Sequence, residues 1–149
     1  MAAEARWTKG LEFRVDYPTG ESLELASLPL DKRPGPGPSP MEAVQAAMAG
    51  CTGMDVISIL EKMRKLPTSL RIVVDARRRD EHPRIYTHML LTYYLEGPDL
   101  DEASAIRAVH LSQEKYCSVA AMLRPTVELG YRIQLNGKLV ETASAITGM

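Results

Sequence analysis

The chain has 149 residues, about the size of one folded domain, and its eighteen lysines and arginines nearly balance nineteen aspartates and glutamates. A net charge of −1 excludes the strongly basic composition of nucleic-acid-binding proteins, and a hydrophobic content of 45% excludes disorder of the whole chain. The apolar stretches are broken well short of the roughly 18 residues that indicate a membrane span, and the first residues lack a secretory signal pattern. We therefore expect one cytoplasmic domain that contacts neither membrane nor nucleic acid and needs no metal or disulfide to fold.

The N-terminal part of the chain is predicted to form three short strands. Residues 11–17 alternate apolar and charged side chains, which is typical of a half-buried strand. A turn signal follows, residues 22–26 return as a second strand, and Trp7 belongs to a strand just before both. Residues 33–40 are rich in proline and glycine and cannot form a helix or an inner strand. They are expected to be a surface connection, or alternatively a loop that frames a site.

A long helix is predicted to follow this segment. Ser39, Pro40 and Glu42 have the spacing of a capping box at a helix start, and the helix should run to about Lys65 because Pro67 stops it. Its first half is apolar or small around the whole circumference, which is typical of a helix buried on most sides. One small domain covers such a helix with difficulty, so we expect a partner subunit to cover it in a homodimer.

Two glycines flank a cysteine in this helix. Gly50 and Gly53 each cost roughly 1 kcal/mol against alanine in a helix interior. Something should compensate for this cost. Close approach of another chain or of a ligand next to Cys51 is the simplest explanation.

The C-terminal half is predicted to alternate strands and helices, giving an α+β fold with antiparallel strands and the helices on one side. The second helix should begin at the N-cap Asp99, with Glu102 at the third position, and run to about Cys117. Residues 137–149 have no clear period and are expected to form a tail. The remaining expected elements are strands at 70–76, 85–95 and 127–135 and a short turn or helix at 118–124.

The two cysteines, Cys51 and Cys117, are either core residues or the chemistry of the protein, since two cysteines do not make a disulfide scaffold. Asp55 lies one helical turn after Cys51, and a carboxylate there disfavours the thiolate. A reactive Cys51 would therefore need a nearby cation, most simply an arginine. Cys117 is expected at a helix end beside Glu114. No metal site is expected from the histidines, whose spacing is not that of metal ligands: His82, His88 and His110.

The two cysteine segments resemble those of a known family. PMEAVQAAMAGCTGMDVISIL at residues 40–60 looks like the first cysteine motif of the family of osmotically inducible protein C (OsmC) and the organic hydroperoxide resistance (Ohr) proteins. SQEKYCSVAAML at residues 112–123 looks like the second motif, and RIYTH at residues 84–88 fits a branch of uncharacterised OsmC-like proteins. The match covers about residues 5–136.

This resemblance implies an OsmC-like α+β fold with antiparallel sheets and two main helices, assembled as an intertwined homodimer with active sites at the subunit interface. It implies thiol-dependent peroxidase chemistry on organic hydroperoxides, and on hydrogen peroxide as a further candidate substrate. Cys51 would be the peroxidatic cysteine, which becomes a sulfenic acid, and Cys117 the resolving cysteine, which condenses with it to a disulfide. An external dithiol, with a lipoyl group as one candidate, would restore the pair. The resemblance implies no metal, haem or flavin.

The chain departs from the family pattern at one position. In the well-studied branches an arginine and a glutamate assist the reactive cysteine, and the glutamate directly follows the proline that opens the long helix. Met41 stands there, and Glu42 comes one residue later, rotated by about 100° and already explained as a capping residue. The assisting arginine has two candidates, Arg14 and Arg84.

Three functions therefore stay open at the level of sequence. The cysteine motifs favour the peroxidase. Met41 and Asp55 favour a non-peroxidase dimer that binds a small apolar or thiol ligand in the same interface pocket. The third alternative is a structural dimer whose cysteines only pack in the core.

Overall fold

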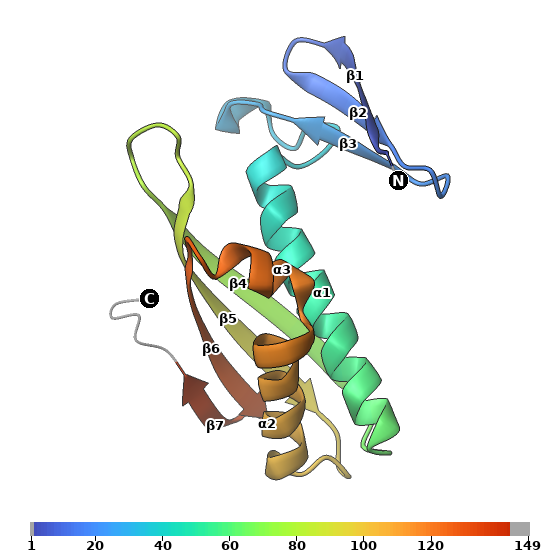
Figure 1. Ribbon diagram of the computed structural model, residues 1–149, viewed down its shortest axis with the longest axis vertical. Helices are drawn as coiled ribbons and strands as arrows, with labels where there is room; N and C mark the ends of the chain where they lie inside the picture. Colours follow the sequence, from blue (N-terminus) through green and yellow to red (C-terminus); the bar gives the residue numbers. More distant parts are fainter. Residues whose placement is uncertain (1, 144–149) are drawn as a thin grey trace. The chain divides into compact units, whose positions relative to one another are not determined.

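The computed structural model describes residues 2–143 and confirms the α+β class. The chain divides into two compact units, one from Met1 to Ala46 and the other from Ala47 to Met149 (Figure 1). The expected single OsmC-like domain over residues 1–149 stays a prediction. The long helix α1 (Pro40–Lys62) begins in the first unit and continues into the second.

The first unit holds the predicted three-stranded antiparallel sheet. Strands β1 (Glu4–Lys9), β2 (Glu12–Asp16) and β3 (Ser22–Ala26) pair in the order of the sequence. A single helical turn, η1 (Leu30–Lys32), opens the proline- and glycine-rich segment. That segment returns to β3, where the Ala26 amide donates to the Pro38 carbonyl at 3.0 Å. Gly37 has no room for a side chain there, because a Cβ would lie 1.8 Å from the Glu24 carbonyl oxygen.

The predicted capping box forms at the start of α1. The Glu42 amide donates to Ser39 Oγ at 3.3 Å, and the Glu42 carboxylate accepts from the Ser39 amide at 2.8 Å and the Ser39 hydroxyl at 2.6 Å. Arg33 donates to the other carboxylate oxygen at 2.6 Å. The hydrogen bond from Arg33, followed by those from Ser39, lowers the pKa of Glu42 to about 2. The carboxylate therefore stabilises the fold in its charged form.

Replacing Glu42 by glutamine should lower the free energy of unfolding at pH 7 by about 1 kcal/mol, a modest value because this side chain is 44% exposed. The folded pKa lies below the unfolded value of about 4.3, so the contribution is complete above that value and is lost as pH falls towards 2. Urea unfolding at pH 7, 4 and 3 should show the penalty of Glu42→Gln shrinking with pH. Glu81→Gln, which replaces an exposed glutamate of the second unit, is the control. A penalty of constant size over this range would contradict the prediction.

The second unit holds a four-stranded mixed sheet. Its strands are β4 (Ser69–Arg78), β5 (Tyr86–Glu96), β6 (Glu128–Leu135) and β7 (Lys138–Ala143), hydrogen-bonded in that order. The expectation that all strands would be antiparallel is wrong for one pair, since β5 and β6 run parallel. The reason is the helical connection between them, which carries the chain back along the sheet before β6 begins. The central strand β5 supplies much of the core, with fully buried side chains at Met89, Leu90, Leu91, Tyr93 and Leu95.

The expected tail at 137–149 is also partly wrong, because β7 pairs with β6 over residues 138–143. Asn136 and Gly137 join the two strands with φ values of 50° and 81°. An Asn-Gly pair with both φ values positive is the preferred two-residue hairpin turn, so the signal was present in the sequence. Residues 144–149 of the expected tail lie outside the described residues.

The second helix differs from its prediction in both its start and its end. It is α2 (Glu102–Leu111), and its N-cap is Asp101 rather than Asp99, because Asp101 accepts from the Ser104 amide at 2.8 Å. It stops well before Cys117. A wider helical turn, η2 (Ser112–Tyr116), follows, and Cys117 then adopts an extended conformation as the N-cap of α3 (Ser118–Leu123).

Within the second unit the helices cover one face of the sheet, as predicted (Figure 1). Thr52 of α1 bonds to Tyr93 of β5, and the His110 ring of α2 meets the Tyr131 ring of β6 edge-on at 5.8 Å. The Tyr93 and Tyr131 rings contact each other at 6.5 Å, so both helices lie on the same face.

Helix α1 buries one stripe and leaves much of its circumference open. The buried residues recur every fourth position: Met48, Thr52, Val56 and Leu60. By length and composition α1 is apolar enough to cross a membrane, which differs from the expectation that no stretch reaches that limit. A helix that packs in a protein core passes the same test, so this is weak evidence for a span.

Candidate functional site

The two cysteines come together in the second unit. Cys51, on α1, is half-buried, and Cys117, which caps α3, is only 3% exposed. Their Sγ atoms and a carboxylate oxygen of Asp55 all lie within 4.8 Å of one another. The fold therefore places both thiols and one carboxylate in a single cluster, which we call the thiol–carboxylate cluster.

Cys117 is held as a neutral thiol. Burial raises the pKa of Cys117 to about 11, an effect that the neighbouring Cys51 thiol and Asp55 carboxylate increase. A hydrogen bond from the Ala120 amide to Cys117 Sγ, at 3.4 Å, acts in the opposite direction. The sequence predicts Cys117 at a helix end beside Glu114, whereas in the structure burial is the main cause of its low acidity.

A buried hydrogen-bond chain runs from the sheet to Asp55. Ser112 Oγ donates to Asp55 Oδ2 at 3.0 Å. The single Ser112 proton is then used, so Thr52 must donate to Ser112 across their 2.8 Å contact. By the same logic the Tyr93 hydroxyl donates to Thr52 across 2.7 Å. Gln113 Nε2 donates to the Tyr93 hydroxyl at 2.7 Å, so every proton in this chain points towards Asp55.

The residues of this hydrogen-bond chain share no signal in the sequence. Thr52, Tyr93, Ser112 and Gln113 come from three separate elements, and only folding brings them together. The available signal was a polar residue inside an apolar helix and another inside an apolar strand, Thr52 and Tyr93. That signal does not say which polar residue meets which.

A cavity of about 580 Å³ adjoins the cluster, between α1 and the α2–η2 segment. Asp55 lies in its wall, and Lys62 and Arg107 bring positive charge to it. Neither cation has an ion-pair partner within residues 2–143. The rest of the lining is mostly apolar: Ile59, Met63, Leu111 and Tyr116.

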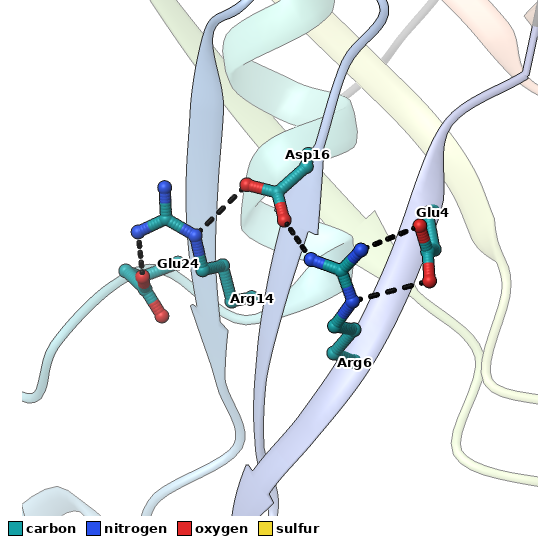
Figure 2. Close-up of polar contacts among 5 residues, drawn as sticks. All are labelled: Glu4, Arg6, Arg14, Asp16 and Glu24. Carbon is teal, nitrogen blue, oxygen red and sulfur yellow. Dashed lines mark hydrogen bonds and ion pairs between the residues drawn. The ribbon is translucent and has the colours of Figure 1, made fainter.

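The residues predicted to assist Cys51 bond to groups outside the thiol–carboxylate cluster. Arg84 is at the tip of the β4–β5 hairpin, where its Nε donates to the Asp80 carbonyl at 3.0 Å. Figure 2 shows Arg14 between Asp16 and Glu24 on the three-stranded sheet, at 2.8 and 3.2 Å. Glu42 forms the capping box and the ion pair with Arg33 described above.

The histidines lie outside the thiol–carboxylate cluster. His88 Nε2 pairs with Glu128 at 3.2 Å. His110 packs on Tyr131, and its Nε2 is buried with no hydrogen-bond partner among residues 2–143. The two sulfurs and the carboxylate oxygen of the cluster itself are atom types that zinc accepts as ligands.

Comparisons with known proteins agree with the cysteine motifs. The family described as OsmC-like protein matches residues 33–132. Protein YhfA of Escherichia coli (strain K12) is 38% identical over 135 residues, which cover 91% of this chain and 98% of YhfA. A hypothetical protein from Aquifex aeolicus VF5 is 28% identical in sequence, with a TM-score of 0.75 over 91% of this chain and 96% of that chain.

The fold is also similar to that of the organic hydroperoxide resistance protein OhrB of Bacillus subtilis. The TM-score is 0.61 at 16% identity, over 90% of this chain and 98% of that chain, which is a likeness of fold alone. The family match spans more than half of the chain, and the similarity to YhfA extends over nearly all of it. The resemblance expected from the two cysteine segments is thereby confirmed: this chain belongs to the OsmC-like protein family.

Proposed function

We propose that the protein is a thiol-dependent peroxidase that reduces organic hydroperoxides, with hydrogen peroxide as a second substrate. The observation that carries this proposal is the placement of both thiols within 4.8 Å of each other, in a cluster whose Asp55 lines a mostly apolar cavity. Family membership supports it, and so does the fold shared with a protein named for organic hydroperoxide resistance.

The proposed reaction has three balanced steps. The Cys51 thiolate attacks one peroxide oxygen, the O–O bond breaks, and the departing alkoxide takes a proton to leave as an alcohol. The Cys117 sulfur then attacks the sulfenic acid on Cys51 and expels water, which leaves a disulfide. An external dithiol, with a lipoyl dithiol as the first candidate, reduces the disulfide by thiol–disulfide exchange and is itself oxidised.

A thiolate beside Asp55 requires a nearby positive charge. Arg14 and Arg84 remain our candidates for this role, and Glu42 for an assisting carboxylate. Single replacements by alanine, or by glutamine for Glu42, would identify the group that lowers the rate constant of Cys51 oxidation.

The experiment is a peroxidase assay on the full chain with a lipoyl dithiol, comparing cumene hydroperoxide with hydrogen peroxide. One equivalent of hydroperoxide should lower the free thiol count from two to zero. Peptide mapping should then find an intrachain Cys51–Cys117 disulfide, which needs the two Cα atoms within about 7 Å. Interchain disulfides only, or none, would count against Cys117 as the resolving thiol.

A binding function is the second candidate, and the weak acidity of Cys117 beside Asp55 favours it. On this alternative the same pocket holds a small apolar or thiol ligand and the thiols do not turn over. Unchanged thiols after hydroperoxide treatment would favour this function over the peroxidase.

We also propose that the protein is an obligate homodimer. The open face of α1 forms one side of a groove of about 790 Å³ that includes Gly50, Gly53 and Met54. A Cβ at Gly50 would meet nothing within 4 Å, and Met54 is 75% exposed, so the described residues of the second unit leave this apolar face uncovered. Obligate interfaces commonly bury more than about 2,000 Å² in total, and a second copy is the simplest source of that area.

Met54→Asp should therefore shift the protein from dimer to monomer in sedimentation velocity runs at micromolar concentration, because a charge would be buried in the interface. Met122→Asp is the matched control, since Met122 is 78% exposed but lies on α3, away from the groove. A stable folded monomer of the unmodified protein at that concentration would rule the proposal out.

A further inference from the structure

The thiol–carboxylate cluster has the composition and size of a cation site. Zinc binds thiolate sulfur at about 2.3 Å and carboxylate oxygen at about 2.0–2.2 Å, so tetrahedral ligands lie roughly 3.5–3.8 Å apart. The three atoms here, from Cys51, Cys117 and Asp55, are within 4.8 Å of one another. A bound zinc ion would draw these atoms together to that spacing.

The donor set of the cluster points the same way. Two sulfur atoms and one carboxylate share this corner, and within residues 2–143 Asp55 takes part in no ion pair with a lysine or arginine. Sulfur ligands combined with a carboxylate oxygen suit zinc.

Two of the three ligands are already oriented by neighbours. The buried chain of Tyr93, Thr52 and Ser112 ends on Asp55 Oδ2, which leaves Oδ1 with no hydrogen bond from residues 2–143. The Ala120 amide holds Cys117 Sγ. Hydrogen bonds of this kind to ligating groups are usual around bound zinc and strengthen metal affinity.

The geometry points to a reversible Zn²⁺ site formed by Cys51, Cys117 and Asp55 in the reduced protein. Three protein ligands leave the fourth position to water, which is typical of an open and exchangeable site rather than a closed structural one. Asp55 also lines the 580 Å³ cavity, which gives water and the ion a path to the cluster. Bound zinc occupies both sulfurs, so it blocks peroxide attack and disulfide formation until it leaves.

The test is a titration of the fully reduced protein with Zn²⁺ by calorimetry, without peroxide, so its outcome is independent of the proposed peroxidase activity. We expect one ion per chain. Asp55→Asn should weaken binding by at least roughly 10-fold, and Cys117→Ser by more than roughly 100-fold, since each removes a ligand rather than a neighbouring group. Asp75→Asn, which removes an exposed carboxylate on β4, is the matched control and should bind as the unmodified protein does.

Substitution of Co²⁺ for zinc makes the test independent of how the variants fold. The unmodified protein should show thiolate-to-cobalt charge-transfer absorption and the visible bands of tetrahedral Co²⁺, and the disulfide form should show neither. Absence of binding to the reduced protein would overturn the inference. So would equal zinc affinity in Asp55→Asn and the unmodified protein, or equal affinity in the reduced and disulfide forms.

Discussion

Cys51→Ser is expected to abolish peroxide reduction, because a serine hydroxyl is a poor nucleophile towards an O–O bond at neutral pH. Cys117→Ser should complete one turnover and then stop as a sulfenic acid or become over-oxidised, since nothing resolves it. The physical basis for this asymmetry is accessibility and acidity. Cys51 is half-buried on α1, whereas Cys117 is 3% exposed and burial raises its pKa to about 11.

A sulfenate-specific reagent separates the two roles. After one equivalent of hydroperoxide, Cys117→Ser should carry the label and Cys51→Ser should not. Each variant serves as the control for the other, because both retain one thiol of the same cluster. Labelling of Cys51→Ser alone would reverse the assignment. If neither variant is labelled, the binding function replaces the peroxidase as the proposed function.

Thr52→Val should destabilise the fold by about 3 kcal/mol, because it leaves more than one buried polar group without its partner at roughly 1–3 kcal/mol each. Valine has nearly the shape of threonine, so no cavity forms. The Thr52 hydroxyl bonds to Tyr93 and Ser112 and also accepts from Gln113 Nε2 at 3.2 Å. For a chain of 149 residues this loss lowers the melting temperature by roughly 6–12 °C.

Thr142→Val is the control, since Thr142 is exposed on β7 and the same atoms are exchanged there without loss of a buried hydrogen bond. Thermal melts of both variants followed by circular dichroism measure the difference. Equal melting temperatures would mean that the buried chain contributes little to stability.

Most elements were predictable because their signals are local. The alternation in residues 11–17, the capping box at Ser39 and Glu42, and the proline that follows α1 each determine structure within a few residues. The errors at Asp99 and at the predicted tail also concern local signals: Asp101 caps α2 through Ser104, and Asn136 begins a hairpin turn. In both cases the sequence contained the correct signal beside a competing one.

The sequence by itself determined the family and the pair of cysteines, since the two motifs and their order in the chain do not depend on packing. Only the tertiary structure decided the environment of these thiols. The break after α2 makes Cys117 a buried N-cap of α3. The hydrogen-bond chain from Tyr93 to Asp55 joins residues from α1, β5 and η2. Periodicity reports which face of an element is apolar, but it carries no information on which buried polar group will meet another across the core.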